Sequence, residues 1–245
     1  MAARQPIAIL LETADFLVVD KPAGIPVTPG RRGGPSLEGL LAAERPKVHH
    51  PPRAVHRLDQ DTSGCLLLAR RARALRQLGR AFAEGQVAKL YLAVVSPGPE
   101  QAEGLVDAPL AKVSRPADGW RMVMAENGKP ARTRWRRLAT EGDEALVALL
   151  PETGRTHQLR VHAQALAPGA AIIGDRVYGR SDRSGLMLHA AALRFPWQGR
   201  WWSAAAPLPA RFPAWAGAPA SAQLAGLLSD SAAIMAEAIR SGSTL

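Results

Sequence analysis

The chain has 245 residues, 47% of them hydrophobic, and a formal net charge of +10 with a sequence pI near 10.9. This length allows one large domain or two small ones, with enough apolar residues for a sizeable core. Arginine supplies all but five of the 31 basic residues, which favours a polyanionic partner because guanidinium groups bind phosphates bidentately and stack on bases. A GC-rich genome that enriches arginine and alanine is the alternative explanation.

The single cysteine, Cys65, excludes an internal disulfide framework and a cysteine-based zinc site. Its apolar neighbours predict a buried hydrophobic residue rather than a nucleophile. The first apolar run, Ile7 to Leu11, is too short for the core of a signal peptide, and no later stretch approaches the length of a membrane span. We therefore expect a cytoplasmic protein that does not contact membranes.

Apolar runs and their glycine or proline breaks predict the elements of the first third. Ile7 to Leu11 and Phe16 to Val19 read as the two strands of a β-hairpin. Residues 28–35, TPGRRGGP, predict a loop that is either merely solvated or in contact with phosphate. Cys65 to Leu68 is a short apolar run opened by glycine, which favours a buried strand. Residues 70–85 have the spacing of an amphipathic helix.

The remaining two thirds contain more strands than helices. Residues 97–104 predict a loop. Further strands are expected at residues 86–95, 129–138, 145–150, 172–175 and 186–195, and helices at 156–167, capped by Thr156, and at 221–240. Strands do not alternate regularly with helices, so the pattern favours an α+β fold over a doubly wound sheet. We predict a catalytic domain over residues 1–216 and an amphipathic helical extension over 217–245.

The stretch from His56 to Gly64, HRLDQDTSG, places several polar side chains directly before the predicted buried strand. Asp59 should therefore lie in an irregular segment that a rigid strand holds in place, a favourable position for a reactive group. The alternative is structural: Arg57 and Asp59 form an ion pair while the following threonine and serine complete a turn.

This stretch resembles the signature of the RluA-type pseudouridine synthases, in which His-Arg-Leu-Asp, two variable residues and Thr-Ser-Gly carry the catalytic aspartate. Four other stretches resemble the same family in the same order: DFLVVDKPAGIPV (15–27), KLYLAVV (89–95), GRTHQLRVH (154–162) and GLMLHAAAL (185–193). The resemblance implies a pseudouridine synthase-like fold, a bent mixed or antiparallel sheet with flanking helices and a catalytic cleft. It also implies a member without the small amino-terminal RNA-binding module of larger relatives.

The resemblance assigns three catalytic residues. Asp59 matches the catalytic aspartate, and aspartate side chains are ionised by default at neutral pH. Arg160 matches the basic residue paired with that aspartate and would keep it charged inside a cleft. Tyr91 matches the active-site tyrosine, whose ring can stack on uracil and whose hydroxyl can help the proton leave carbon 5.

Four further residues are expected to contact the substrate. Arg57 matches the residue proposed in the family to fill the space that the target base vacates, and Leu188 is expected to line the pocket beneath the base. His56 belongs to the same motif as Arg57. Arg155 begins the GRTHQLR stretch, where its position suggests a turn or an RNA contact.

The reaction implied by the resemblance is a redox-neutral isomerisation of uridine that needs no cofactor and no metal. His157 and His162 are five residues apart on a predicted helix and would point in different directions, which disfavours a metal pair. The expected partner is structured RNA, either ribosomal or transfer RNA, bound by a monomer through arginines at 31–32, 70–80 and 132–137. The alternatives are a non-catalytic RNA-binding protein or RNA chaperone of the same fold and, with less support, a metal-dependent nuclease.

Overall fold

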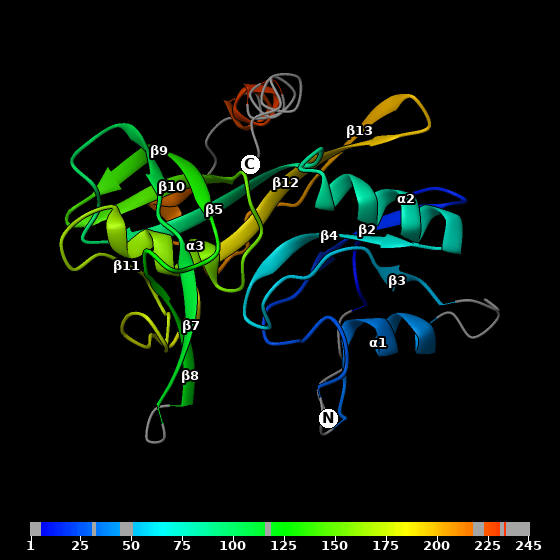
Figure 1. Cartoon of the computed structure of the whole chain (residues 1–245), viewed down its shortest axis with the longest axis horizontal. Coiled ribbons are helices and arrows are strands. Elements are labelled where there is room, and N and C mark those ends of the chain that lie inside the picture. The colour runs from blue at the N-terminus through cyan, green and yellow to red at the C-terminus, as the bar shows by residue number, and fades with distance from the viewer. Residues whose placement is uncertain are drawn as a thin grey trace. The chain divides into compact units, whose positions relative to one another are not determined.

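The structure of the chain is a computed structural model that describes residues 6–30, 33–44, 51–115, 119–217, 223–230 and 233 (Figure 1). These residues form two compact units. The first unit combines Met1–Val87 with Ala190–Pro207, and the second combines Ala88–His189 with Leu208–Leu245. Strand β12 (Leu188–Trp197) crosses the boundary, with its first two residues in the second unit and the rest in the first.

The first unit consists of antiparallel strands and two helices. Its elements are β1 (Ile9–Glu12), β2 (Phe16–Lys21), α1 (Leu37–Glu44), β3 (Arg53–Ala54), β4 (Ser63–Ala69), α2 (Ala72–Ala83), most of β12 and β13 (Arg200–Ala205). Strand β2 pairs with both β1 and β4, β3 pairs with β4, and β12 pairs with β13. The predicted amino-terminal hairpin, buried strand and arginine-rich helix are confirmed.

Aromatic side chains form much of the core of the first unit. Phe16 is fully buried and meets Phe195, Trp197 and Trp202 edge to face, with ring centroids 5.2, 6.1 and 5.3 Å away. Every residue of β4 is buried, which agrees with its continuous apolar run. Burial, together with the charge of a nearby aspartate, raises the pKa of the Cys65 thiol to about 12. The thiol therefore remains protonated, and the prediction of a buried hydrophobic cysteine is confirmed.

Gly64 lets β4 pass against β12 with no room for a side chain. Its φ is +107°, and a Cβ there would lie 2.2 Å from the carbonyl oxygen of Ala190. Gly64→Ala is expected to lower the free energy of unfolding by about 2 kcal/mol or more, because backbone strain of this kind is worth about 1–3 kcal/mol before the clash is relieved. Urea denaturation measures this change.

Gly79, in the interior of α2, is the matched control because a Cβ there meets nothing within 4 Å. Gly79→Ala should stabilise the protein by roughly 0.5–1 kcal/mol, since alanine loses less backbone entropy in a helix. Equal denaturation midpoints for wild type and Gly64→Ala would contradict the expected strain.

The second unit is built around antiparallel strands that belong to the same 11-stranded sheet as those of the first unit. Its elements are β5 (Ala88–Ser96), β6 (Glu103–Asp107), β7 (Leu110–Arg115), β8 (Gly119–Met124), β9 (Arg132–Glu141), β10 (Glu144–Pro151), α3 (Gln158–His162), the 3-10 turn η1 (Ala163–Ala165), β11 (Ala171–Ile172) and the 3-10 turn η2 (Ala214–Ala216). Strand β10 pairs with β5 and β9, β6 pairs with β9, and β11 pairs with β5. Strands β7 and β8 form a separate two-stranded hairpin, seen at the lower end of the green strands in Figure 1.

The fold class is confirmed as α+β, since every strand pair given above is antiparallel and helices α1 to α3 do not alternate with the strands. Helix α1 and strands β6, β7, β8 and β13 were not predicted. The boundary between residues 216 and 217 stays a prediction. Of the predicted helix over 221–240, the described residues 223–230 and 233 are helical, and Arg31 and Arg32 of the predicted loop lie outside the described residues.

The predicted capping of this helix by Thr156 is wrong. Helix α3 begins at Gln158, and the preceding His157 adopts a left-handed conformation with φ 53° and forms no side-chain cap. The Gln158 carboxamide instead ties the preceding turn to the helix, because its Oε1 accepts a hydrogen bond from the main-chain N–H of Arg155 at 2.9 Å. The helix is also shorter than expected and ends in the 3-10 turn η1.

Candidate active site

Asp59 lies in a turn immediately before β4, where the sequence placed it. Its side chain is half-buried, and its main-chain oxygen accepts a hydrogen bond from the N–H of Thr62 at 3.1 Å. Leu58, the preceding residue, is buried, which fixes one side of the turn in the core. The Asp59 carboxylate therefore lies on a short segment between buried Leu58 and the buried strand β4.

Lys21, at the end of β2, ties this turn to a second loop. Its side chain is completely buried, and its Nζ donates to the main-chain oxygens of Pro22, Ile25 and Gln60 at 2.9, 2.8 and 2.9 Å. An ammonium group has three donors, and these three oxygens accept from it. Because Gln60 follows Asp59 directly, Lys21 restrains the backbone beside the candidate catalytic carboxylate. The sequence reasoning assigned no role to Lys21.

His56 and Arg57 differ in their surroundings. The His56 Nε2 accepts a hydrogen bond from the main-chain N–H of Leu67 at 3.1 Å, and the ring stacks on Phe82 with centroids 4.4 Å apart. The imidazole therefore anchors the motif to β4 and α2. Arg57 is exposed, as a residue that reaches for a substrate would be. Contact of either side chain with RNA stays a prediction.

Tyr91 lies on β5, half-buried, opposite Leu149 of β10. Lys89, two residues earlier on the same strand face, donates from Nζ to the main-chain oxygen of Thr153 at 3.3 Å. Burial lowers the pKa of Lys89 to about 8. Tyr91 therefore shares its strand face with an amine that loses its proton more readily than an exposed lysine. Leu188, the first residue of β12, is buried.

Arg160 is held by a carboxylate that the sequence reasoning missed. Its Nε and Nη2 donate to Oδ2 and Oδ1 of Asp175, each at 2.7 Å, and the two side chains are 10% and 0% exposed. Burial opposes ionisation of Asp175, but the hydrogen bonds and charge of Arg160, with two main-chain N–H groups, outweigh it and hold its pKa below the usual range. The guanidinium and carboxylate form a buried ion pair.

Tyr178 completes the support of Arg160. The Arg160 guanidinium lies over the Tyr178 ring, 5.1 Å from its centroid. The Tyr178 hydroxyl accepts a hydrogen bond from the Met122 N–H at 2.9 Å and lies 2.8 Å from His157 Nδ1. We call Asp175 and Tyr178 the Arg160 clamp. A Gly-Asp pair at a strand end with tyrosine three residues later is the sequence signal that could have revealed it.

Arg155 is anchored in the turn that leads to α3. Its Nε donates to the main-chain oxygen of Pro130 at 2.8 Å, in line with the turn role considered for it. The predicted site residues are distributed over both units. His56, Arg57 and Asp59 belong to the first unit, and Tyr91, Arg155, Arg160 and Leu188 belong to the second. The pairing of Arg160 with Asp59 stays a prediction.

Three of the four arginines of β9 have carboxylate partners. Arg132 lies 3.2 Å from Asp107, Arg134 donates to Glu152 at 2.7 Å, and Arg136 lies 2.6 Å from Glu103. Local carboxylates therefore balance much of the positive charge that the sequence offers to RNA in this strand. A direct contact of these arginines with RNA stays a prediction.

Groups of three or more histidine, cysteine, aspartate or glutamate side chains that could hold a metal ion do not occur among the described residues. In the same part of the chain, no helix combines the length and apolar character needed to cross a membrane.

Comparison with known proteins identifies the family. The family model described as RNA pseudouridylate synthase matches residues 15–165. An uncharacterized RNA pseudouridine synthase of Zymomonas mobilis is 50% identical over 188 residues, which are 76% of this chain and 85% of the relative. The dual-specificity RNA pseudouridine synthase RluA of Escherichia coli is 39% identical over 194 residues, with the same coverage of 76% and 85%.

Two further comparisons agree. Ribosomal large subunit pseudouridine synthase D of Nitrosomonas europaea is 42% identical over 181 residues, although the match covers 72% of this chain and only 51% of that relative. The solved structure of human RNA pseudouridylate synthase domain containing 1 has a TM-score of 0.78 at 30% identity, covering 94% of this chain and 98% of that one. The chain therefore belongs to the RluA-type family of RNA pseudouridine synthases.

Proposed function

We propose that this enzyme isomerises a uridine in structured ribosomal or transfer RNA, using the Asp59 carboxylate and no cofactor. The observation that carries the proposal is the turn at Asp59, which holds the aspartate of the family pattern between buried Leu58 and strand β4. The names of the relatives support the choice of RNA. RluA of Escherichia coli is described as dual-specific and the Nitrosomonas europaea relative as acting on the ribosomal large subunit.

The reaction exchanges one bond to the ribose for another. The bond from uracil nitrogen 1 to the sugar breaks, the base rotates, and a bond forms from its carbon 5 to the sugar. Carbon 5 then loses its proton to solvent, and nitrogen 1 gains a proton. In this proposal Asp59 acts as an anion on the sugar or the base. The target base has to leave its stack first, which costs a few kcal/mol in a duplex and less in a loop.

The proposal gives Arg160 and Tyr91 supporting roles. Arg160 supplies positive charge that favours the ionised form of the catalytic carboxylate, and the Arg160 clamp fixes the direction of its guanidinium. Tyr91 stacks on the uracil and assists proton loss from carbon 5. Arg57, His56, Arg155 and Leu188 are proposed substrate contacts. The cytoplasmic location and the monomeric state stay predictions.

The test is a direct assay of the purified enzyme on RNA that lacks pseudouridine, with chelator present and no added cofactor. We expect pseudouridine to form at defined positions, because the proposed chemistry uses only protein side chains. Mapping pseudouridines in cells with and without the protein identifies the RNA. Activity that is lost with chelator and regained with a divalent ion, while the RNA fold is unchanged in both conditions, would count against the cofactor-free mechanism.

A further inference from the structure

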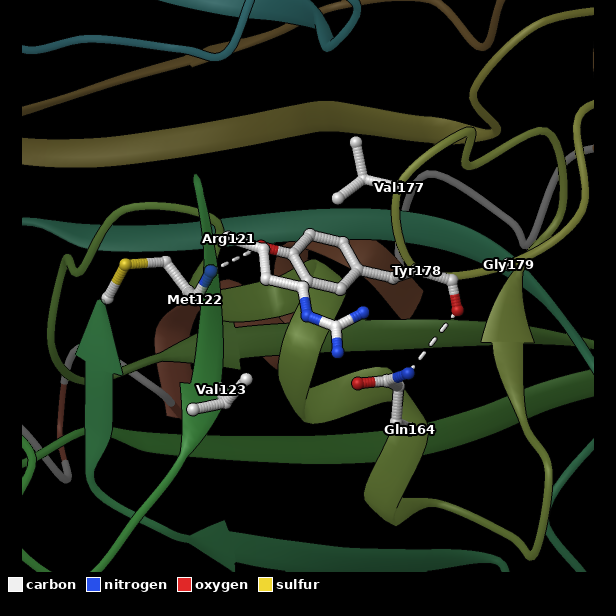
Figure 2. A pocket seen from close by; sticks show the side chains of 7 residues that line it. All are labelled: Arg121, Met122, Val123, Gln164, Val177, Tyr178 and Gly179. Carbon is white, nitrogen blue, oxygen red and sulfur yellow. Dashed lines mark hydrogen bonds between the residues drawn. The ribbon is translucent and has the colours of Figure 1, made fainter. Parts of the chain in front are cut away.

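A cavity of about 310 Å³ lies in the second unit beside the Arg160 clamp. Arg121 and Val123 of β8 line one side, Gln164 of η1 lines another, and Val177 and Tyr178 close it (Figure 2). Tyr178 is the same residue whose ring supports Arg160. Tyr178 therefore belongs both to the cavity lining and to the support of the candidate catalytic guanidinium.

Arg121 brings a positive charge to this cavity. Figure 2 shows its guanidinium pointing into the space between Tyr178 and Gln164, and none of the lining residues is acidic. Among the described residues, its Nε is buried and has no hydrogen-bond partner. A buried donor without an acceptor costs about 1–3 kcal/mol, so an oxyanion at this edge of the guanidinium would remove a penalty as well as gain an ion pair.

The groups beside Arg121 also favour an oxyanion as the ligand. The Gln164 Nε2 donates to the main-chain oxygen of Tyr178 at 3.3 Å, a long bond that a stronger acceptor can replace. Arg176 and Arg180 are exposed on the segment that contributes Val177 and Tyr178. In contrast to the ion-paired arginines of β9, this part of the second unit offers positive charge to an external anion.

We propose that this cavity binds a phosphate group of the RNA backbone, with Arg121 as its principal ligand and Gln164 as a second donor. The inference rests on the proposed action on RNA and adds a contact outside the reacting uridine. Phosphate contacts fix the register of a protein on a nucleic acid without reading its sequence. A phosphate held against Tyr178 would hold the RNA strand at a constant place relative to Arg160.

Salt titrations of RNA affinity test the proposal. One phosphate contact contributes about 0.7–0.9 to the slope of log affinity against log salt for single-stranded and duplex nucleic acid. Arg121→Gln is therefore expected to reduce the slope by about 0.7–0.9 and to weaken binding about four- to sixfold at 0.15 M salt. Arg121→Lys keeps the charge and should recover most of the slope. A wild-type slope in Arg121→Gln overturns the proposal.

Arg53→Gln is the matched control, because Arg53 lies outside the arginine clusters expected to meet RNA. It removes the same charge from β3, where Glu38 lies 3.6 Å from Arg53. We expect its salt slope to equal that of the wild type. An equal loss of slope in Arg53→Gln and Arg121→Gln would mean that only net charge matters, which also overturns the site. Circular dichroism of each variant checks that the fold is intact.

Two additional measurements complete the test. The first distinguishes free phosphate from RNA phosphate as the ligand, and the second distinguishes failure of the phosphate site from failure of the proposed function. Inorganic phosphate that stabilises the wild type but not Arg121→Gln against heat, with unchanged RNA slopes, would identify free phosphate as the ligand and overturn the RNA assignment. A wild-type enzyme that binds RNA with the Arg121-dependent slope but forms no pseudouridine would refute the proposed function alone. Turnover by the wild type, with no slope change in Arg121→Gln, would refute the phosphate site alone.

Discussion

Asp59→Asn is expected to abolish pseudouridine formation while the fold and the RNA affinity stay close to those of the wild type. Asparagine has nearly the same volume but no negative charge, and the turn depends on main-chain contacts such as the Asp59 oxygen to the Thr62 N–H. The single-turnover rate should fall by more than about a thousandfold, the scale expected when a catalytic side chain is removed. Pseudouridine formed per enzyme on bound RNA measures this directly.

Asp61→Asn is the control for this experiment, because it makes the same chemical change at an exposed position of the same motif. Its rate should remain close to that of the wild type. Normal turnover in Asp59→Asn would refute the mechanism. Weakened RNA binding with normal chemistry on bound RNA would instead make Asp59 a substrate contact.

Asp175→Asn is expected to destabilise the second unit by about 3–5 kcal/mol, since it removes the carboxylate charge that pairs with the buried Arg160 guanidinium. Denaturant titration measures the loss. The pKa of Asp175 lies below its usual range, so the ionised carboxylate contributes its stability at pH values above about 3.9. That contribution disappears as the pH falls through the lower pKa of the folded state. The difference between wild type and variant should therefore shrink in acid.

Glu103→Gln provides the comparison for the Asp175 variant. It breaks the exposed pair with Arg136, whose loss should change stability by about 0–1 kcal/mol. In a double-mutant cycle, Asp175→Asn combined with Arg160→Met should be less destabilising than the sum of the single changes, because the buried charge is removed with its partner. Additive losses, or a loss below about 1 kcal/mol in Asp175→Asn, would contradict a tightly coupled pair.

The secondary-structure elements that were predicted correctly are those for which one physical signal in the sequence dominates. Strand β4 followed from a continuous apolar run, α2 from helical spacing, and β5 from strict alternation. The placement of Asp59 followed from its position directly before β4. In each case the nearest neighbours in the chain determine the local structure.

Features that depend on distant partners were not predictable in this way. The β7–β8 hairpin is partly exposed and carries no regular apolar pattern, so only its pairing defines it. The role of Asp175 depends on Arg160, fifteen residues earlier, and that of Lys21 on Gln60, 39 residues later. The left-handed backbone conformation of His157 was not predicted either, because non-glycine residues seldom adopt it.

The buried Lys21 amine has a consequence for how this enzyme meets its substrate. Since three main-chain oxygens accept from one nitrogen, the segment beside Asp59 moves only if several hydrogen bonds break together. The backbone that carries the carboxylate is therefore ordered before RNA arrives, and little entropy remains to be lost there on binding. Adaptation to RNAs of different shape then has to come from the RNA itself or from other, less restrained parts of the protein.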